Sequence, residues 1–148
     1  MKFSKKSRYG LRALVDLAVN SKTAHVSLYS IAERNDISPQ YLEQVFASLR
    51  RAGIVRSIKG PQGGYLLNHD SKEITVADII YALEGDYHIE EETASEDSSY
   101  RGISITIQKL VVDEVNDKLD QVLENLTLAD LERSYTDYQS YDQGMYYI

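Results

Sequence analysis

The sequence contains no cysteine. This absence excludes disulfides, zinc sites built on thiolates, iron–sulfur clusters ligated by cysteine, and redox sensing by a thiol. The sequence also has no apolar run near the ~20 residues that cross a bilayer, and its first residues, MKFSKKSRYG, lead into an amphipathic pattern rather than a signal core. We therefore expect a cytoplasmic protein of one domain, or of one domain with an added oligomerisation element.

Basic residues are scarce in the second half of the chain and acidic residues are scarce in the first. Residues 1–67 hold 11 Lys and Arg against 4 Asp and Glu, a net charge of +7, whereas the whole 148-residue chain carries −7. Affinity for nucleic acid depends on local Lys and Arg near phosphates, so an acidic remainder weakens non-specific binding without abolishing it. The overall charge therefore does not exclude a DNA-binding protein.

The stretch Ser38 to Leu67 has the clearest structural pattern. Ser38 can cap a helix and Pro39 suits its first turn, where a missing backbone donor costs nothing. Apolar residues then recur at helical spacing and are expected to face the core, at Leu42, Val45, Phe46 and Leu49. The opposite face is polar, and basic at its far end, with Gln40, Glu43, Gln44, Arg50 and Arg51.

A β-hairpin is predicted directly after this helix. Gly53 ends the helix, residues 54–59 alternate as a strand does, Gly60 to Gly64 form a tight tip, and residues 65–67 return as the partner strand. A helix with an exposed polar face followed by a basic hairpin is typical of a winged helix-turn-helix, in which the helix enters the DNA major groove and the hairpin touches the flanking backbone. We predict a mainly α fold with a small hairpin, and a DNA-binding domain over residues 1–85.

Two helices are predicted before the recognition helix, over residues 4–20 and 27–35. Lys2, Lys5, Lys6 and Arg8 crowd the start of the first helix, where cations oppose the helix dipole. We expect an external anion, a DNA phosphate, to compensate them; the alternative is a solvated basic end. After the hairpin, Thr75 and Asp78 form a capping signature for a helix that Gly85 closes.

The second half of the chain is expected to serve assembly. Residues 86–102 form an acidic, flexible loop, and residues 103–135 form the longest helix and a short helix after it. A long apolar stripe beyond a complete small domain suits pairing with its copy in a two-fold dimer, and the alternative is that it folds back on its own domain. The proposed dimer residues are Ile107, Val111, Val115, Leu119, Val122 and Leu126.

The last segment, residues 136–148, shows no helical period and is predicted as a non-helical tail. It ends in Met145, Tyr146, Tyr147 and Ile148. A bulky apolar end that carries a carboxylate can serve as a peptide ligand, because a backbone nest holds the carboxylate while a pocket takes the side chain. The alternative is an ordinary frayed terminus.

The chain resembles the winged-helix repressor family that includes the iron–sulfur cluster regulator, the nitric-oxide-sensing repressor and the cysteine metabolism repressor. The resemblance spans nearly the whole sequence: SKKSRYGLRALVDLA, IAERNDIS, ISPQYLEQVFASLRRAGIVRSIKGPQGGYLL, ITVADIIYALEG and LTLADL. It implies dimers on palindromic operators, with the long helix crossing to the other subunit. It also implies that residues of the recognition helix lie in or beside the major groove, and that Lys59 and Gly60 approach the minor groove or the backbone.

The chain departs from the cluster-binding members of that family. They keep three cysteines in the segment equivalent to residues 86–104, where this sequence offers only hydroxyl side chains at Thr93, Ser95, Ser98, Ser99 and Ser104. We therefore expect no cluster and no other cofactor. The MYYI ending resembles the cysteine metabolism subgroup. That resemblance implies a partner enzyme, O-acetylserine sulfhydrylase, whose active site accepts C-terminal isoleucine peptides and whose binding strengthens operator occupancy until O-acetylserine competes.

Hydrogen-bonding geometry assigns roles to the polar face. Gln40 and Gln44 suit adenine, Arg50 suits guanine or phosphate, and Glu43 either accepts from a cytosine amino group or forms an intramolecular salt bridge. Lys59 suits phosphate and sets affinity rather than sequence preference. These arguments and the resemblance together imply that the residues in contact with DNA are Lys5, Arg8, Ser38, Gln40, Tyr41, Glu43, Gln44, Arg50, Arg51, Lys59 and Gly60.

Two other functions remain open at this stage. The same fold could sense a small molecule or metal directly, since His88 lies beside three glutamates, or it could use its exposed face to bind protein. An enzyme is not expected. The glycines match neither nucleotide-binding spacing, and no Ser/His/Asp set falls on recognisable elements.

Overall fold

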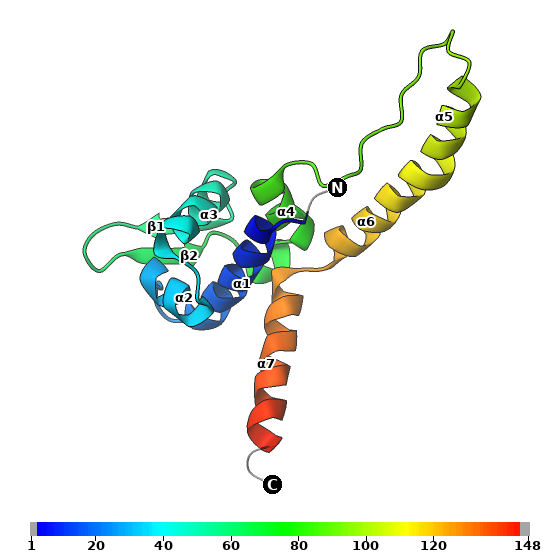
Figure 1. The fold of residues 1–148 in the computed structure, drawn as a ribbon. Coiled ribbons are helices and arrows are strands. Elements are labelled where there is room, and N and C mark those ends of the chain that lie inside the picture. The colour runs from blue at the N-terminus through cyan, green and yellow to red at the C-terminus, as the bar shows by residue number, and fades with distance from the viewer. Residues whose placement is uncertain (1–2, 146–148) are drawn as a thin grey trace.

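The computed structural model describes residues 3–145 and is mainly helical with one two-stranded antiparallel hairpin, as predicted (Figure 1). None of the helices in that range is long and apolar enough to cross a membrane. In chain order the elements are α1 (Lys5–Asn20), α2 (Leu28–Asn35), α3 (Pro39–Arg51), β1 (Val55–Ile58), β2 (Gly64–Leu67), a 3₁₀ turn η1 (Ser71–Glu73), α4 (Val76–Glu84), α5 (Arg101–Ile107), a π-helical turn η2 (Gln108–Val112), α6 (Asp113–Asn125) and α7 (Leu128–Met145).

Serine caps begin the first three helices, and the one at Ser38 confirms the prediction from the sequence. The Ser38 hydroxyl accepts a hydrogen bond from the Tyr41 backbone N–H at 3.1 Å, and Ser27 and Ser4 do the same for α2 and α1. Each cap satisfies a backbone donor that the helix itself leaves unpaired, which is worth about 1 kcal/mol. Between α2 and α3 the chain turns sharply through Asp36, whose φ of 53° is left-handed.

The core lies where α1, α2 and α3 meet. The predicted inward face of α3 is confirmed, since Leu42, Val45, Phe46 and Leu49 are all fully buried. They pack with residues of α1 and α2 and with both strands of the hairpin in one cluster. Burying side chains of this size contributes about 1.5–3 kcal/mol each. This packing holds the polar face of α3 outward on a rigid support.

The hairpin is attached to the helical unit on one side. Its strands pair from Val55 opposite Leu67 to Ile58 opposite Gly64. At its tip Gly60 has φ +111°, a conformation that glycine adopts readily, and its carbonyl accepts from the Gly63 N–H at 2.9 Å. At its base Tyr65 exchanges two backbone hydrogen bonds with Val26, the residue just before the cap of α2. The hairpin is therefore fixed relative to the helix-turn-helix.

A second, smaller cluster joins α4 to α6. The predicted capping box of Thr75 and Asp78 is present. Leu119 and Leu126 of the predicted dimer stripe pack here within their own chain, against buried Val76, Ile80 and neighbouring residues. Two of the six predicted dimer residues therefore contact their own chain, because the C-terminal part of this helix lies against α4, and their contact with a partner stays a prediction.

The long helix, formed by α5, η2 and α6, projects from the body as an arm, with only the C-terminal part of α6 against α4 (Figure 1). It begins at Arg101 rather than at Ile103. Ile107, Val111, Val115 and Val122 of the predicted stripe are 39–60% exposed. Apolar side chains adjacent to them are exposed too, at Ile103, Ile105 and Leu110.

The prediction of a non-helical tail from residue 136 is wrong, because α7 continues from Leu128 to Met145. Its start is fixed by a capping box of Thr127 and Asp130 and by Leu128, which is fully buried. Leu131 still packs against the second cluster and Glu132 pairs with Lys22. Farther along, α7 leaves the body (Figure 1), so no apolar face is required for packing and the helical period that the sequence analysis sought is absent. Tyr146, Tyr147 and Ile148 lie outside the described residues.

The acidic segment between α4 and α5 contains no helix or strand, but its first residues are attached to α6. The Tyr87 hydroxyl donates to Asp120 at 2.6 Å, and His88 contacts Asp120 through Nε2 at 2.7 Å and Asp86 through Nδ1 at 2.6 Å. The hydrogen bond to Asp120 is the main factor that raises the pKa of His88, with Asp86 adding to it and partial burial opposing it. Asn116 exchanges two hydrogen bonds with the Ile89 backbone.

Candidate nucleic-acid interface

The outward face of α3 is polar and accessible, as the sequence predicted. Ser38, Gln40, Glu43 and Gln44 are exposed along it, and Arg50 and Arg51 are exposed at its C-terminal end. Side chains of this kind on a helix of 13 residues match what a major groove admits and what base edges can bond. The whole face projects from the fully buried core residues described above.

Glu43 makes no ion pair within residues 3–145. The intramolecular salt bridge considered from the sequence is therefore not formed. Its carboxylate stays exposed as an acceptor, which a cytosine amino group can satisfy.

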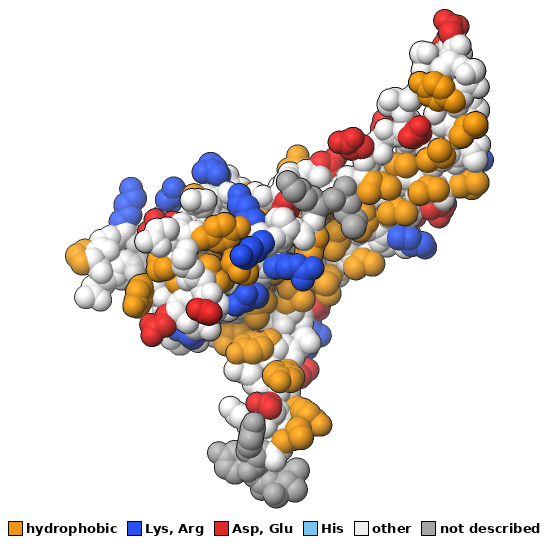
Figure 2. Space-filling view, in the orientation of Figure 1, with side chains coloured by type: hydrophobic (Ala, Val, Ile, Leu, Met, Phe, Trp, Pro, Cys, Tyr) orange, Lys and Arg blue, Asp and Glu red, His pale blue; other side chains and the backbone are white. Residues whose placement is uncertain are grey.

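Tyr41 is half-buried and links α3 to α1. Its ring meets that of Tyr9 edge to face, with centroids 5.6 Å apart. The Lys5 ammonium lies 5.4 Å from the centre of the Tyr9 ring and the Arg12 guanidinium 5.1 Å from it. The basic start of α1 therefore lies beside the N-terminal half of α3. Figure 2 shows Lys and Arg side chains gathered over this part of the molecule.

Two further cationic side chains lie on this face: Arg12, which the sequence prediction missed, and Lys6, which was expected to meet an external anion but was left out of the residues expected to contact DNA. Arg12 donates to the Asn35 carbonyl at the turn before α3, and Lys6 donates to the Ser48 hydroxyl at 3.1 Å. Arg12 follows Arg8 by one helical turn, a spacing that puts both on one face and could have revealed it. By contrast, the contact of Lys6 with α3 depends on tertiary packing.

The hairpin places Lys59 and Gly60 at its exposed tip, and Arg56 is exposed on β1. These positions suit contact with a sugar–phosphate backbone beside the groove. Arg34, in contrast, is occupied within the chain, since its guanidinium bonds the Asp16 carboxylate at 2.7 and 2.9 Å. That hydrogen bonding raises the pKa of Arg34.

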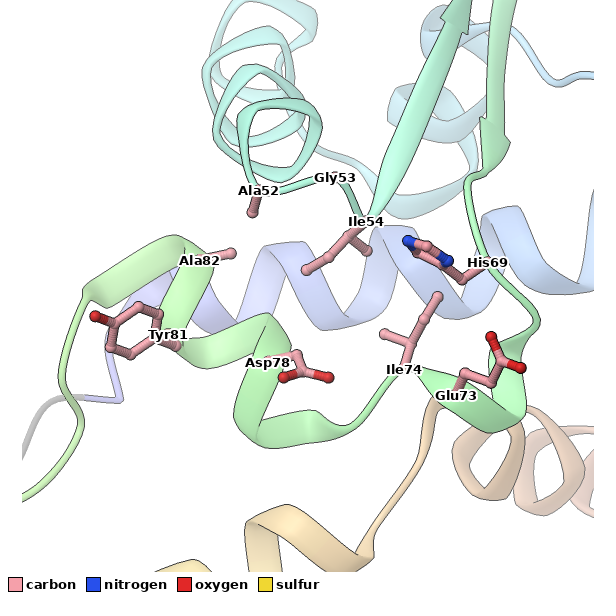
Figure 3. A pocket seen from close by; sticks show the side chains of 9 residues that line it. All are labelled: Ala52, Gly53, Ile54, His69, Glu73, Ile74, Asp78, Tyr81 and Ala82. Atoms are coloured by element: carbon pink, nitrogen blue, oxygen red, sulfur yellow. The ribbon is translucent and has the colours of Figure 1, made fainter.

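A hollow of about 530 Å³ lies on another part of this domain, between the end of α3 and α4 (Figure 3). Ile54, Ile74 and Ala82 line it, with His69, Glu73 and Asp78 on its polar parts. The Asp78 carboxylate is already bonded to the Thr75 backbone N–H at 3.1 Å in the capping box. None of the residues expected to contact DNA lines this hollow.

The segment equivalent to the cluster loop of the family that the sequence resembles has hydroxyl side chains where the cluster-binding members keep cysteines. One of these, Ser104, is 4% exposed, and its hydroxyl donates to Glu92 at 3.0 Å. His88 is bound by Asp86 and Asp120 rather than by the neighbouring glutamates, and residues 3–145 contain no group of three His, Asp or Glu arranged to hold a metal. Neutral hydroxyls do not replace the thiolates that hold an iron–sulfur cluster, so these positions do not fit a cysteine-ligated cluster.

Comparison with known proteins agrees with this architecture. Residues 3–134 match the family model Rrf2, described as "Iron-dependent Transcriptional regulator". The chain is 40% identical over 148 residues to the HTH-type transcriptional regulator CymR of Bacillus subtilis (strain 168), with both chains fully covered. It is 37% identical over 131 residues to IscR of Enterobacter sp. (strain 638), covering 88% of this chain and 79% of that one.

Solved structures give the same result. The structure of CymR (YrzC), the global cysteine regulator of B. subtilis, matches with a TM-score of 0.73 and 37% identity over 90% of this chain and 98% of that one. T. potens IscR matches with a TM-score of 0.74 and 40% identity, over 94% and 91%. These relatives are named as regulators and not as enzymes, which confirms the expectation drawn from the sequence. This chain belongs to the Rrf2 family of winged-helix transcriptional regulators.

Proposed function

We propose that this protein is a repressor that binds palindromic operators as a homodimer and controls genes of sulfur and cysteine metabolism. The observation that carries the proposal is the exposed polar face of α3, flanked by the cations of α1 and by Lys59 on the hairpin. In this arrangement α3 reads base edges, while α1 and the hairpin hold the phosphates on its two sides.

Dimerisation is supported by the arm. Ile103, Leu110 and Val122 are 60–66% exposed on a helix that leaves the body of its own chain, and Figure 2 shows apolar side chains running along it. A continuous apolar stripe on a projecting helix costs free energy in water, and a two-fold partner with the same stripe covers it. For a two-fold dimer we expect operator half-sites whose centres lie one helical repeat of DNA, about 34 Å, or a multiple of it apart.

The proposed partner enzyme is O-acetylserine sulfhydrylase, bound through the C-terminal residues. The support is the likeness to CymR over the full length of both chains, together with an apolar C-terminal sequence. Helix α7 carries Met145 well away from the DNA-binding domain, so an enzyme of globular size can engage the end of the chain without covering α3 (Figure 1). O-acetylserine would compete with the C-terminal peptide for the enzyme and relieve repression.

Selection of chromosomal fragments by the purified protein, with and without the sulfhydrylase, tests the proposal. We expect enrichment of fragments that share a palindrome upstream of sulfur genes, and tighter binding when the enzyme is present. Equal recovery of every fragment at moderate salt, under both conditions, would refute a DNA-binding function and favour the protein-interaction alternative.

The partner is tested by deleting Tyr147 and Ile148. The truncated chain should lose capture of the enzyme and keep its own DNA affinity, whereas Tyr138→Ala, at an exposed position of α7, should change neither. Unchanged enzyme capture by the truncated chain contradicts the tail mechanism. Release of DNA by O-acetylserine in the absence of enzyme indicates direct sensing instead.

A further inference from the structure

The side chains of Lys6 and Arg51 meet at one buried hydroxyl. Lys6 Nζ on α1 and Arg51 Nη2 on α3 lie 3.1 and 3.2 Å from the Oγ of Ser48. Ser48 is 7% exposed, and its own hydroxyl proton points to the Gln44 carbonyl, 3.3 Å away. The oxygen is thus committed as an acceptor, and both cations donate to it.

This arrangement leaves positive charge uncompensated. Neither Lys6 nor Arg51 forms an ion pair with a carboxylate in the part of the chain that the structure describes. Two like charges held at one neutral oxygen repel each other, and a single hydroxyl cannot saturate the three donors of an ammonium and the five of a guanidinium. The remaining donors stay available to an anion.

The position of the pair on the molecule identifies that anion. Arg51 is exposed at the C-terminal end of α3, next to Arg50, and Lys6 lies in the basic first turn of α1 between Lys5 and Arg8. When α3 lies in a major groove, the end of the helix approaches the backbone that borders the groove. A tetrahedral phosphate can accept from an ammonium and a guanidinium at once.

We propose that Lys6 and Arg51 form a two-cation clamp for one DNA backbone phosphodiester in each half-site, and that Ser48 positions them. This inference rests on the proposed DNA-binding function and adds a contact that ties α1 and α3 to the same phosphate. The clamp fixes the depth and angle of the recognition helix. Ser48 is a positioning residue, because its buried oxygen faces the cations rather than the DNA.

The test uses the full-length protein and an operator fragment recovered in the chromosomal selection. Phosphate ethylation interference should show one position per half-site where a neutralised phosphate blocks the wild-type protein. Ethylation at that position should no longer affect DNA binding by the double variant Lys6→Ala/Arg51→Ala. The operator affinity of this variant should be lowered at least about tenfold, as expected for the loss of charged hydrogen bonds. The salt slope, meaning the slope of the logarithm of the binding constant against the logarithm of the salt concentration, should fall in magnitude by about 2 per dimer. Each half-site loses one neutralised phosphate, and each such phosphate contributes about 0.9.

Matched variants separate the clamp from a merely structural contact. Lys6→Arg/Arg51→Lys keeps both charges, so ethylation of the same phosphate should still block its binding. Lys72→Ala removes an exposed charge on η1 and should change neither the interference pattern nor the salt slope. Ser48→Ala should weaken binding several-fold while leaving the salt slope as in the wild type. If the double variant does not fold, the single variants Lys6→Gln and Arg51→Gln should each reduce the interference.

An unchanged interference pattern and salt slope in a folded double variant overturns the clamp while leaving the proposed function intact. The same holds if the affinity falls only in proportion to a measured loss of stability. Failure of the wild-type protein to prefer any fragment overturns the proposed function instead, so the two failures are distinguishable.

Discussion

Replacing Leu110 by Asp tests whether the arm is a dimer interface. Leu110 is 65% exposed on η2, in the middle of the apolar stripe, so its substitution removes little from the folded monomer. Burying a whole leucine side chain is worth about 1.5–3 kcal/mol, and about two thirds of this one is available to a partner. The expected loss is about 1–2 kcal/mol for each copy.

Two-fold symmetry doubles this effect, because both subunits carry the substitution. A loss of about 2–4 kcal/mol raises the dissociation constant of the dimer between roughly 30-fold and several hundred-fold. Desolvation of the new carboxylate adds to that figure. Operator affinity should fall along with dimerisation, because two half-sites are then bound independently.

Sedimentation equilibrium over a wide concentration range measures the dissociation constant directly. Tyr29→Asp is the matched control, since Tyr29 is 67% exposed but lies on α2, away from the arm. We expect this control to dimerise like the wild-type protein. A Leu110→Asp protein with an unchanged dissociation constant, or a wild-type protein that stays monomeric at high concentration, would refute the assignment.

Four further predictions concern the other parts of the molecule. Lys59→Ala should weaken binding equally on different operators and lower the salt slope by about one unit per subunit, whereas Gln40→Ala should cost about 1–3 kcal/mol and relax one base position, both in gel shifts over a salt series. His88→Gln should lower the melting temperature more at pH 5.5 than at pH 8.5, because a pKa raised by Asp120 gives stability that is full below the unfolded pKa and is lost as the pH rises through the folded pKa. Leu128→Ala should cost about 2–5 kcal/mol in denaturant unfolding, because the side chain is fully buried at the start of α7.

Local rules were enough to predict the helix-turn-helix and the hairpin. Serine caps, the spacing of Leu42 to Leu49 and the glycines of the hairpin each act within a few residues, so their effect is visible in the sequence. The same holds for the Thr75 capping box, which the structure contains. The contact of the predicted residues with DNA stays a prediction.

Features that depend on distant parts of the chain could not be predicted in this way. Leu119 has the same spacing as the exposed stripe residues, and only the approach of α4 makes it an intrachain contact. His88 was considered with its neighbouring glutamates, yet its partners are Asp86 and Asp120, the latter 32 residues away. Helix α7 has little amphipathic character because it leaves the body, and a method that relies on apolar period does not detect such a helix.

The division of charge along the chain becomes a division in space, and this explains how a protein of net charge −7 can favour DNA. The 18 residues of α7 span about 27 Å at 1.5 Å per residue, and Asp137 and Asp142 lie on its outer part. Asp137 and Asp142 lie about 14 and 21 Å along the helix from the buried Leu128. At physiological ionic strength the Debye length is about 8 Å, so both charges are largely screened from the face of α3. The phosphates therefore meet the local field of α1, α3 and the hairpin. A consequence is that neutralising acidic residues of α7 should change DNA affinity far less than neutralising a single cation beside α3, even though both alter the net charge by one unit.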